Sequence, residues 1–180
     1  MLYSTFYLGE TQMGLPIPSI LEIGRGFDFH PVRGAPEVID GLINLRGKVV
    51  TIINTGLAFE TQKVLASDES RVYILKNNAE LREVADADFD IETSPDNIGI
   101  HVDRIADVIS FEKEELQPVP ANINHPFYKH VVRRGNEFII ILEPQKILNL
   151  NQYSFNFIKF FSISYFQLLE FKPNKQLFDE

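Results

Sequence analysis

The stretch GLINLRGKVVTIIN, residues 41–54, decides the fold that we expect for this chain. Its second half, Lys48–Asn54, is dense in β-branched residues and too short for an ordinary helix, so it predicts a buried strand. Gly47 lets the backbone turn sharply into that strand. Arg46 then stands at the mouth of an apolar strand, where a permanently charged group needs a partner or water. That position fits either a docking residue or one half of a structural ion pair.

Composition restricts the class of protein. The chain has 180 residues, 44% of them hydrophobic, which suffices for one ordinary domain or two small ones. It contains no cysteine, which excludes a disulfide scaffold, thiolate zinc sites and a cysteine nucleophile. A net charge of −8 argues against sequence-independent binding to nucleic acid. The N-terminal residues lack the pattern of a secretory signal, so a cytoplasmic protein is expected.

Turn residues punctuate a series of short apolar runs on both sides of the opening stretch. Hairpins are expected over residues 2–17 and 128–142, the second around a Gly-Asn turn. Pro16 and Pro18 should make the first hairpin end there or lie at a sheet edge. The other expected elements are a short apolar segment over 19–23, a helical turn over 36–41, a strand over 71–76, a half-buried strand over 98–110, a loop over 111–126 and a short helix over 143–150. Many short strands with little helix indicate an all-β barrel architecture.

Two segments stand apart from this pattern. Residues 77–97 hold seven acids and one arginine, a net charge of −6. They could be an acidic docking loop, but a solvated insertion between two strands is the favoured interpretation. Residues 151–180 hold seven of the 15 phenylalanines and two of the six tyrosines. Their spacing fits a strand face or a helical stripe, of which the helix is favoured, and polar residues interrupt the segment too often for a membrane span.

The order of the motifs carries a family resemblance. FYLG, GLPIPSILEI, PEVIDGLINLRGKVVTIIN and IGIHVDRIADVIS, followed by the last hairpin and LEPQKIL, resemble the CheW family of chemotaxis coupling proteins over about residues 3–150. The most specific part is GLINLRG, because Gly41, Asn44, Leu45, Arg46 and Gly47 all fall in the most recognisable segment of that family. The pattern GxxVDxIxDV at residues 99–108 supports the match.

The resemblance implies a fold, partners and a site. The fold is two small five-stranded SH3-like β-barrels packed together over residues 1–150, with short C-terminal helical elements, and residues 151–180 form an aromatic-rich extension. The implied function is a non-catalytic scaffold that binds the cytoplasmic tip of methyl-accepting chemoreceptors and the regulatory domain of a CheA-type histidine kinase. Such a scaffold is cytoplasmic, is recruited to membrane-associated receptor arrays, and needs neither cofactor nor metal nor insertion into the membrane. Carried over by position, the receptor-facing residues are Ile20, Glu22, Gly41 and Arg46.

Two other classes of function fit the sequence less well. An enzyme is not indicated, since His125 and His130 are five residues apart, and Asp103 and Asp107 fit a strand end and a turn cap better than a shared proton. There is also no glycine-rich phosphate loop and no Gly-x-Ser-x-Gly elbow. The alternative function is a β-barrel nucleic-acid-binding module, against which the acidic net charge argues. It would use Lys129, His130, Arg133 and Arg134 together with Phe127 and Tyr128.

Overall fold

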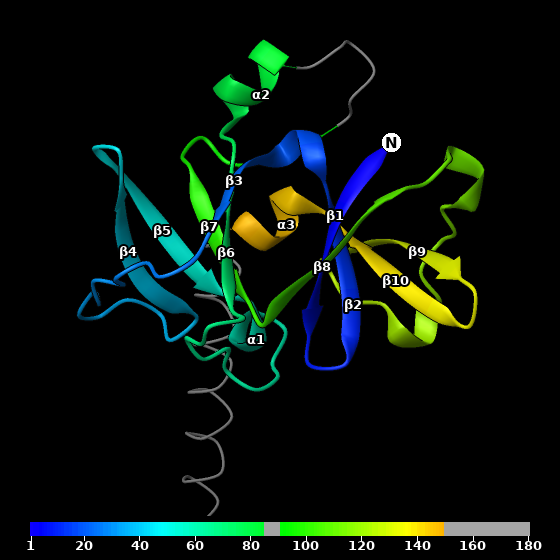
Figure 1. Cartoon of the computed structure of the whole chain (residues 1–180), viewed down its shortest axis with the longest axis horizontal. Coiled ribbons are helices and arrows are strands. Elements are labelled where there is room, and N and C mark those ends of the chain that lie inside the picture. Colours follow the sequence, from blue (N-terminus) through cyan, green and yellow to red (C-terminus); the bar gives the residue numbers. More distant parts are fainter. Residues whose placement is uncertain (85–90, 150–180) are drawn as a thin grey trace, which may run out of the picture. The chain divides into compact units, whose positions relative to one another are not determined.

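The structure, a computed structural model, describes residues 1–84 and 91–149 and contains two five-stranded sheets (Figure 1). The first sheet, which we call barrel A, has the strand order β8-β1-β2-β10-β9, and the second, barrel B, has the order β3-β6-β7-β5-β4. Barrel A consists of β1 (Leu2–Leu8), β2 (Thr11–Pro16), β8 (Arg104–Ser110), β9 (Tyr128–Arg134) and β10 (Glu137–Leu142). Barrel B consists of β3 (Ile20–Gly24), β4 (Ile39–Leu45), β5 (Lys48–Asn54), β6 (Arg71–Leu75) and β7 (Ile98–Val102). The described residues also form three short α-helices, α1 (Thr55–Ala58), α2 (Asn78–Val84) and α3 (Pro144–Leu148), and three 3-10 turns, η1 (Ile17–Ser19), η2 (Lys113–Glu115) and η3 (Ala121–Ile123).

Each sheet is closed by one further backbone bridge, which joins one end strand to the segment that follows the other end strand. In barrel B the chain leaves β3 and returns at His30, whose backbone exchanges two hydrogen bonds of 2.9 Å with Leu42 in β4. In barrel A the chain leaves β8 and returns at Gln117, which makes the same exchange with Val131 in β9. Closure satisfies the backbone groups that an open edge would leave unpaired. The expected pair of small β-barrels is therefore confirmed.

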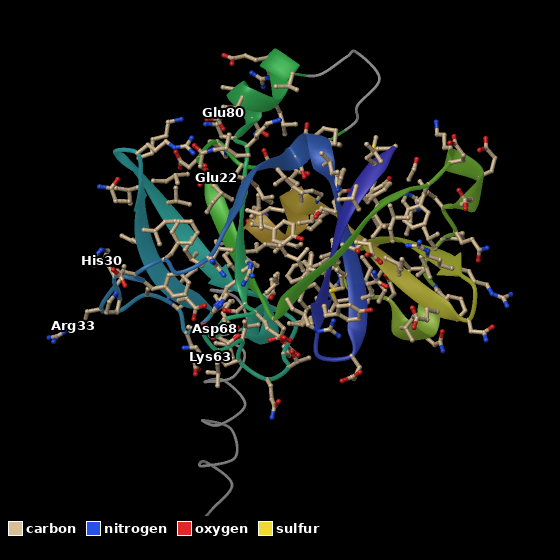
Figure 2. All side chains as sticks on the ribbon, viewed as in Figure 1. Glu22, His30, Arg33, Lys63, Asp68 and Glu80 are labelled. Atoms are coloured by element: carbon tan, nitrogen blue, oxygen red, sulfur yellow. The ribbon has the colours of Figure 1, made fainter. Side chains whose placement is uncertain are left out.

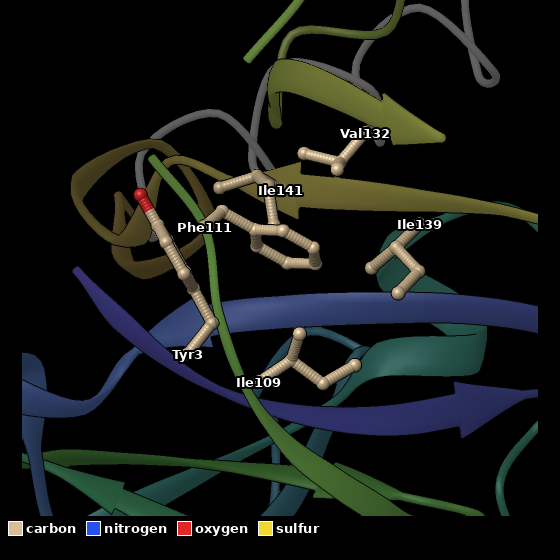
Figure 3. Close-up of a cluster of buried hydrophobic side chains, with 6 residues drawn as sticks. All are labelled: Tyr3, Ile109, Phe111, Val132, Ile139 and Ile141. Atoms are coloured by element: carbon tan, nitrogen blue, oxygen red, sulfur yellow. The ribbon is translucent and has the colours of Figure 1, made fainter. Parts of the chain in front are cut away.

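Both barrels have an apolar core made by the alternate residues of their strands. Figure 3 shows the core of barrel A, where side chains from β1, β8, β9 and β10 meet Phe111. The members of this cluster are Tyr3, Ile109, Phe111, Val132, Ile139 and Ile141. The corresponding cluster in barrel B is Ile43, Leu45, Val50, Ile52, Val72 and Ile74, with Leu21, Phe27 and Phe29 packed against it. The segment that closes barrel B at His30 contains Phe27 and Phe29, so it also covers the core of that barrel.

Tyr73 joins the two barrels. It lies on β6 of barrel B and is completely buried, and its ring centre is 5.3 Å from that of Phe6 in barrel A. Its hydroxyl group lies 3.0 Å from Ser4 Oγ and donates to the carbonyl oxygen of Thr5. Burial raises the pKa of Tyr73, and the hydrogen bond to Ser4 opposes this only in part. A buried tyrosine with its hydroxyl satisfied in this way fixes the orientation of one barrel on the other.

The expected single strand over residues 98–110 is in fact two strands in different barrels. The chain passes from β7 in barrel B to β8 in barrel A at Asp103, whose carboxylate accepts a 2.7 Å hydrogen bond from the backbone of Gly9. Asp103 ends a strand as expected, whereas Asp107 lies inside β8 and does not cap a turn. All five residues of β7 are buried, because β7 is the central strand of its sheet and is covered on both faces. The prediction of a half-buried strand over residues 98–110 was therefore wrong for β7.

Other expectations were confirmed or corrected at the level of elements. Both hairpins form, and β2 ends at Pro16, but β2 is not an edge strand because β10 pairs with it in parallel. The helical turn expected over residues 36–41 is wrong: Ile39 donates to the Pro36 carbonyl in a β-turn and already belongs to β4. The short helix expected over 143–150 is α3. The insertion over 77–97 contains α2, whose Leu81 is 5% exposed, so this part of it is not simply solvated.

The aromatic segment over 151–180, expected to be helical, lies outside the described residues. Within residues 1–84 and 91–149, no helix is long and apolar enough to cross a membrane.

Candidate docking site

The hairpin of β4 and β5 presents Arg46 at its tip. Arg46 and Gly47 are the two central residues of the turn and have φ angles of 52° and 86°. Two positive φ angles are the requirement of a type I′ turn, which suits the twist of a tight hairpin. Asn44 completes the turn, since its side-chain oxygen accepts a 2.8 Å hydrogen bond from the backbone of Gly47. The segment before the expected strand is therefore itself a strand, and Arg46 is part of the turn.

Arg46 is paired with Glu22 in the structure. Arg46 Nη2 donates to Glu22 Oε2 at 2.6 Å, and the two side chains are 80% and 26% exposed. Glu22 lies on β3, which stands at the opposite end of the sheet order from β4. The ion pair therefore spans the seam at which barrel B closes. With its guanidinium group so exposed, Arg46 can form further bidentate hydrogen bonds to a carboxylate or carbonyl of a partner.

Ile20 and Glu22 lie on the same strand, but strand alternation does not place them on one face. Ile20 pairs with Leu75 and Glu22 with the adjacent Ile74, so the register shifts by one residue between them. Leu21, between the two, packs against the core of barrel B, and Ile20 is half-buried. The structure thus brings Glu22 and Arg46 into contact, whereas Ile20 is near Glu22 only along the chain.

Gly41 is not part of this exposed surface. It is buried, and a Cβ atom added there would lie 2.6 Å from the backbone oxygen of His30. Its φ angle of 149° also suits glycine better than other residues. Gly41 lies five positions before Arg46, about 16 Å along an extended strand. Its observed role is to let the closing segment at His30 approach β4.

A second ion pair holds the same hairpin from the side of the insertion. Lys48, the first residue of β5, donates to Glu80 Oε1 on α2 at 2.9 Å. Glu80 Oε2 accepts hydrogen bonds from the backbone of Asn77 at 3.0 Å and from the side chain of Asn97 at 2.6 Å. Burial opposes ionisation of this carboxyl group, but these donors together with Lys48 outweigh it and lower the pKa of Glu80. Figure 2 shows Glu22 and Glu80 at the same end of barrel B.

Asp40, the residue before Gly41, is the centre of a buried polar cluster. Asp40 Oδ2 is 2.8 Å from His101 Nδ1, and the two side chains are 5% and 3% exposed. The side-chain amide of Asn54 donates to both Asp40 oxygens, and Lys63 Nζ lies 3.5 Å from one of them. Asn54 also caps α1 by accepting from the backbone of Leu57. Every member therefore has hydrogen-bond partners, and the cluster ties β4, β5, β7 and the segment after α1 together.

A pocket of about 390 Å³ lies where the β1–β2 turn approaches the segment after α1. Its apolar residues come from barrel A and from Phe59 at the end of α1, and its polar groups include Lys63, which Figure 2 shows far from Glu22 and Glu80, on the opposite side of barrel B. The wall is backed by an aromatic group in which the rings of Phe59 and His125 lie 5.1 Å apart between centres, and each lies within 5.8 Å of the rings of Phe127 and Tyr128. The lining residues are Leu8, Gly9, Thr11, Met13, Phe59, Thr61, Gln62, Lys63, Asp103 and Tyr128.

The basic residues of the β9–β10 hairpin do not form an unopposed positive patch. Lys129 Nζ is 2.9 Å from Glu143, and Arg134 is 4.0 Å from Asp107. Arg133 donates to the backbone oxygen of Gly135. Phe127 is 4% exposed, so it offers little surface for stacking on a base. Nothing in this geometry favours the nucleic-acid alternative. In the described part of the chain, no group of three or more His, Cys, Asp or Glu side chains could hold a metal ion.

The sequence did not reveal the Lys48–Glu80 clamp or the buried Asp40–His101 pair. Each joins residues that are more than 30 positions apart, and no local period marks such a pair. A local signal was available at Asn54, a polar residue directly after an apolar run, because asparagine is a favoured helix N-cap. The spacing Asn77-x-x-Glu80 is likewise a capping pattern that predicts the start of a helix.

The chain is similar to known proteins in its family pattern, in its sequence and in its fold. The model of the CheW-like domain family matches residues 3–152. The chemotaxis protein CheW of Treponema pallidum (strain Nichols) is 32% identical over 151 residues, covering 81% of this chain and 80% of that protein. The chemotaxis protein CheW of Klebsiella aerogenes is 28% identical over 148 residues, covering 80% and 79%. The crystal structure of the scaffolding protein TtCheW from Thermoanaerobacter tengcongensis superposes with a TM-score of 0.68 at 24% identity, over 82% of this chain and 92% of that one.

Proposed function

Because the chain belongs to the CheW-like domain family, we propose that it is a scaffold that couples chemoreceptors to a CheA-type histidine kinase in chemotaxis signalling. Residues 1–150 are the scaffold domain in this assignment, and residues 151–180 are an aromatic-rich extension. The scaffold has no turnover of its own and acts in the cytoplasm, where it is recruited to membrane-associated receptor arrays. It binds the cytoplasmic tip of a methyl-accepting chemoreceptor and the regulatory domain of the kinase.

The exposed Arg46–Glu22 pair is the observation that carries the receptor side of the proposal. Arg46 sits at a hairpin tip with its side chain 80% exposed, although the pair spans the barrel seam. Val49, three residues further on, is 70% exposed and supplies an apolar contact beside the charges. An apolar surface next to an arginine suits a partner helix that packs its apolar face and offers a carboxylate or carbonyl to Arg46. Ile20 adds a half-buried apolar contact on the β3 side.

Gly41 supports this surface from within and does not touch the partner. Its close contact with the backbone of His30 holds the closing segment on β4, and that closure keeps β3 and the β4–β5 hairpin in register. The proposed site is therefore Ile20, Glu22 and Arg46 as contacts, with Gly41 as a residue that maintains the scaffold.

Co-sedimentation with a receptor fragment and a histidine kinase from the same organism tests the proposal directly. The wild-type protein is expected to enter the receptor–kinase pellet and to change the kinase activity measured there. Arg46→Ala should stay folded and lose receptor binding. Arg133→Ala is the matched control, because Arg133 is exposed on the β9–β10 hairpin of barrel A, and this variant should bind like the wild type. Equal binding by Arg46→Ala and wild type, or ATP hydrolysis by the purified scaffold alone, would contradict the proposal.

A further inference from the structure

The insertion over residues 77–97 is docked on the same hairpin that carries Arg46. Its helix α2 reaches β5 through the Lys48–Glu80 ion pair of 2.9 Å. Lys48 is the residue directly after the Arg46–Gly47 turn. The tip of the hairpin is therefore held by two carboxylates from outside it, Glu22 on β3 and Glu80 on α2.

The base of the insertion is built to keep Glu80 in place. Asn77 and Glu80 cap the start of α2 reciprocally, since Glu80 N donates to Asn77 Oδ1 at 2.9 Å and Asn77 N donates to Glu80 Oε2 at 3.0 Å. Asn97 bridges Glu80 Oε2 and the backbone oxygen of Leu75 in β6. Leu81, which follows Glu80, is 5% exposed. Glu80 is thus fixed to β6 and to the start of β7, which makes it a firm anchor for Lys48.

We infer that α2 is a positioning element for the docking hairpin, which acts through Glu80 on Lys48 and so sets the affinity for the receptor helix. This inference rests on the proposed function of Arg46. A hairpin tip that is already ordered loses less conformational freedom when a partner binds, so each clamp that fixes the tip increases affinity. Because coupling between sites is reciprocal, receptor binding should in turn stabilise α2.

The main test compares receptor-fragment affinity for Lys48→Met, Glu80→Gln and the double variant. Lys48→Met removes the cation and leaves the capping bonds of Glu80 intact, and Lys48 is 61% exposed, so the variant should fold. Each single variant should weaken binding about two- to fivefold, the effect of one exposed ion pair. The double variant should be no weaker than either single variant, because both remove the same clamp. Lys129→Met is the matched control, since it removes another ion pair, in barrel A, and should leave affinity unchanged.

Amide hydrogen exchange provides a second measurement that a purely structural role would not move. Receptor fragment added to the wild-type protein should slow exchange in α2, and this protection should be lost in Lys48→Met. Loss of affinity in Lys48→Met but not in Glu80→Gln would mean that Lys48 contacts the receptor itself, which overturns the positioning role. Unchanged affinity in both variants also overturns it. If Arg46→Ala binds normally in the same assay, the proposed function fails and not merely this inference.

Discussion

At the scale of the residue, Arg46 combines exposure with an unfavourable backbone conformation. Its φ of 52° lies in the left-handed region, which costs an ordinary residue about 1–2 kcal/mol relative to the right-handed region. Asparagine or glycine is the usual choice at this position of a type I′ turn. An arginine is therefore retained here at a cost in stability, and the physical reason that we propose is its contact with the partner.

Replacement of Arg46 by asparagine should separate stability from binding. Arg46→Asn loses the exposed pair with Glu22, which contributes under about 1 kcal/mol, and gains a residue suited to the turn. We expect its unfolding free energy in urea to stay within about 1 kcal/mol of the wild type, while receptor-fragment binding is lost. A variant that unfolds far more easily would instead make Arg46 a structural residue of the barrel seam.

Gly41, unlike Arg46, is expected to contribute to stability and not to contact with the partner. Gly41→Ala places a methyl group 2.6 Å from the His30 backbone oxygen at a φ of 149°, so the closing segment of barrel B must move. We expect a loss of about 1–3 kcal/mol in unfolding free energy, measured by urea denaturation. Gly135→Asn is the control, because the φ there is 62°, no atom lies within 4 Å of the added Cβ, and asparagine tolerates that conformation. If the two variants are equally stable, the close approach at His30 is not what requires glycine.

At the scale of the element, the insertion contributes more than its composition suggests. Deletion of residues 79–96 with an Asn-Gly turn removes α2 and with it the buried Leu81. The barrels should still fold, but with a loss of about 1.5–3 kcal/mol, the effect of exposing one leucine, since shortening a loop changes entropy little. Differential scanning calorimetry of the deletion and of Leu81→Ala should give similar losses. An unchanged melting temperature in both would show that α2 is not packed on the barrel.

Local patterns predicted the elements well where the decisive interaction is local. The Gly-Asn turn lies inside its own hairpin, so turn residues and apolar runs were enough to find that hairpin. The β4–β5 hairpin was predicted only in part, since the strand after Gly47 was expected but the strand before Arg46 was not. Residues 98–110 show why the rest failed. Their apolar pattern is continuous, but the break at Asp103 depends on Gly9, 94 positions away, and on a change of sheet that no short window contains. The helical turn at Pro36 failed for the same reason, because pairing with β5 overrides the local signal.

At the scale of the whole molecule, stability should depend on pH through two histidines. Burial lowers the pKa of His125, with Glu60 opposing it, and burial and Lys129 lower that of His130, with the Gln117 backbone and Glu143 opposing them. Both histidines therefore have a lower pKa in the folded chain than in the unfolded chain, where the histidine pKa is about 6.5. Below that pH the unfolded chain binds more protons than the folded chain. The stability that the neutral rings contribute is present above that value and is lost as the pH falls below it.

Urea unfolding between pH 7.5 and 5.5 measures this dependence, in a range above the titration of ordinary carboxyl groups. The wild-type unfolding free energy should fall towards pH 5.5. The double variant His125→Phe, His130→Gln should lose this part of the slope, with the phenylalanine packing among Phe59, Phe127 and Tyr128. A wild-type protein that became more stable towards pH 5.5 would contradict the assigned direction.

The site could be predicted only in part. The family resemblance pointed to Glu22 and Arg46, and the structure brings these two into contact across the barrel seam. It also pointed to Gly41, which the structure buries under His30. Position in a motif does not distinguish a residue that touches a partner from one that shapes the surface behind it. The Glu80 clamp was out of reach because Lys48 and Glu80 are 32 positions apart, and no local pattern marks such a pair.

The order of the strands has a consequence for synthesis on the ribosome. Barrel B is made of one continuous stretch, β3 to β7, and all its strands have been translated once Val102 is added. Barrel A combines the N-terminal hairpin with β8, β9 and β10, so it cannot close before Leu142. Domains fold from the N-terminus as the chain emerges, and an isolated hairpin is barely stable in water. The nascent chain is thus expected to carry a folded barrel B beside an unpaired β1–β2 hairpin, which makes that hairpin the segment most in need of chaperone protection.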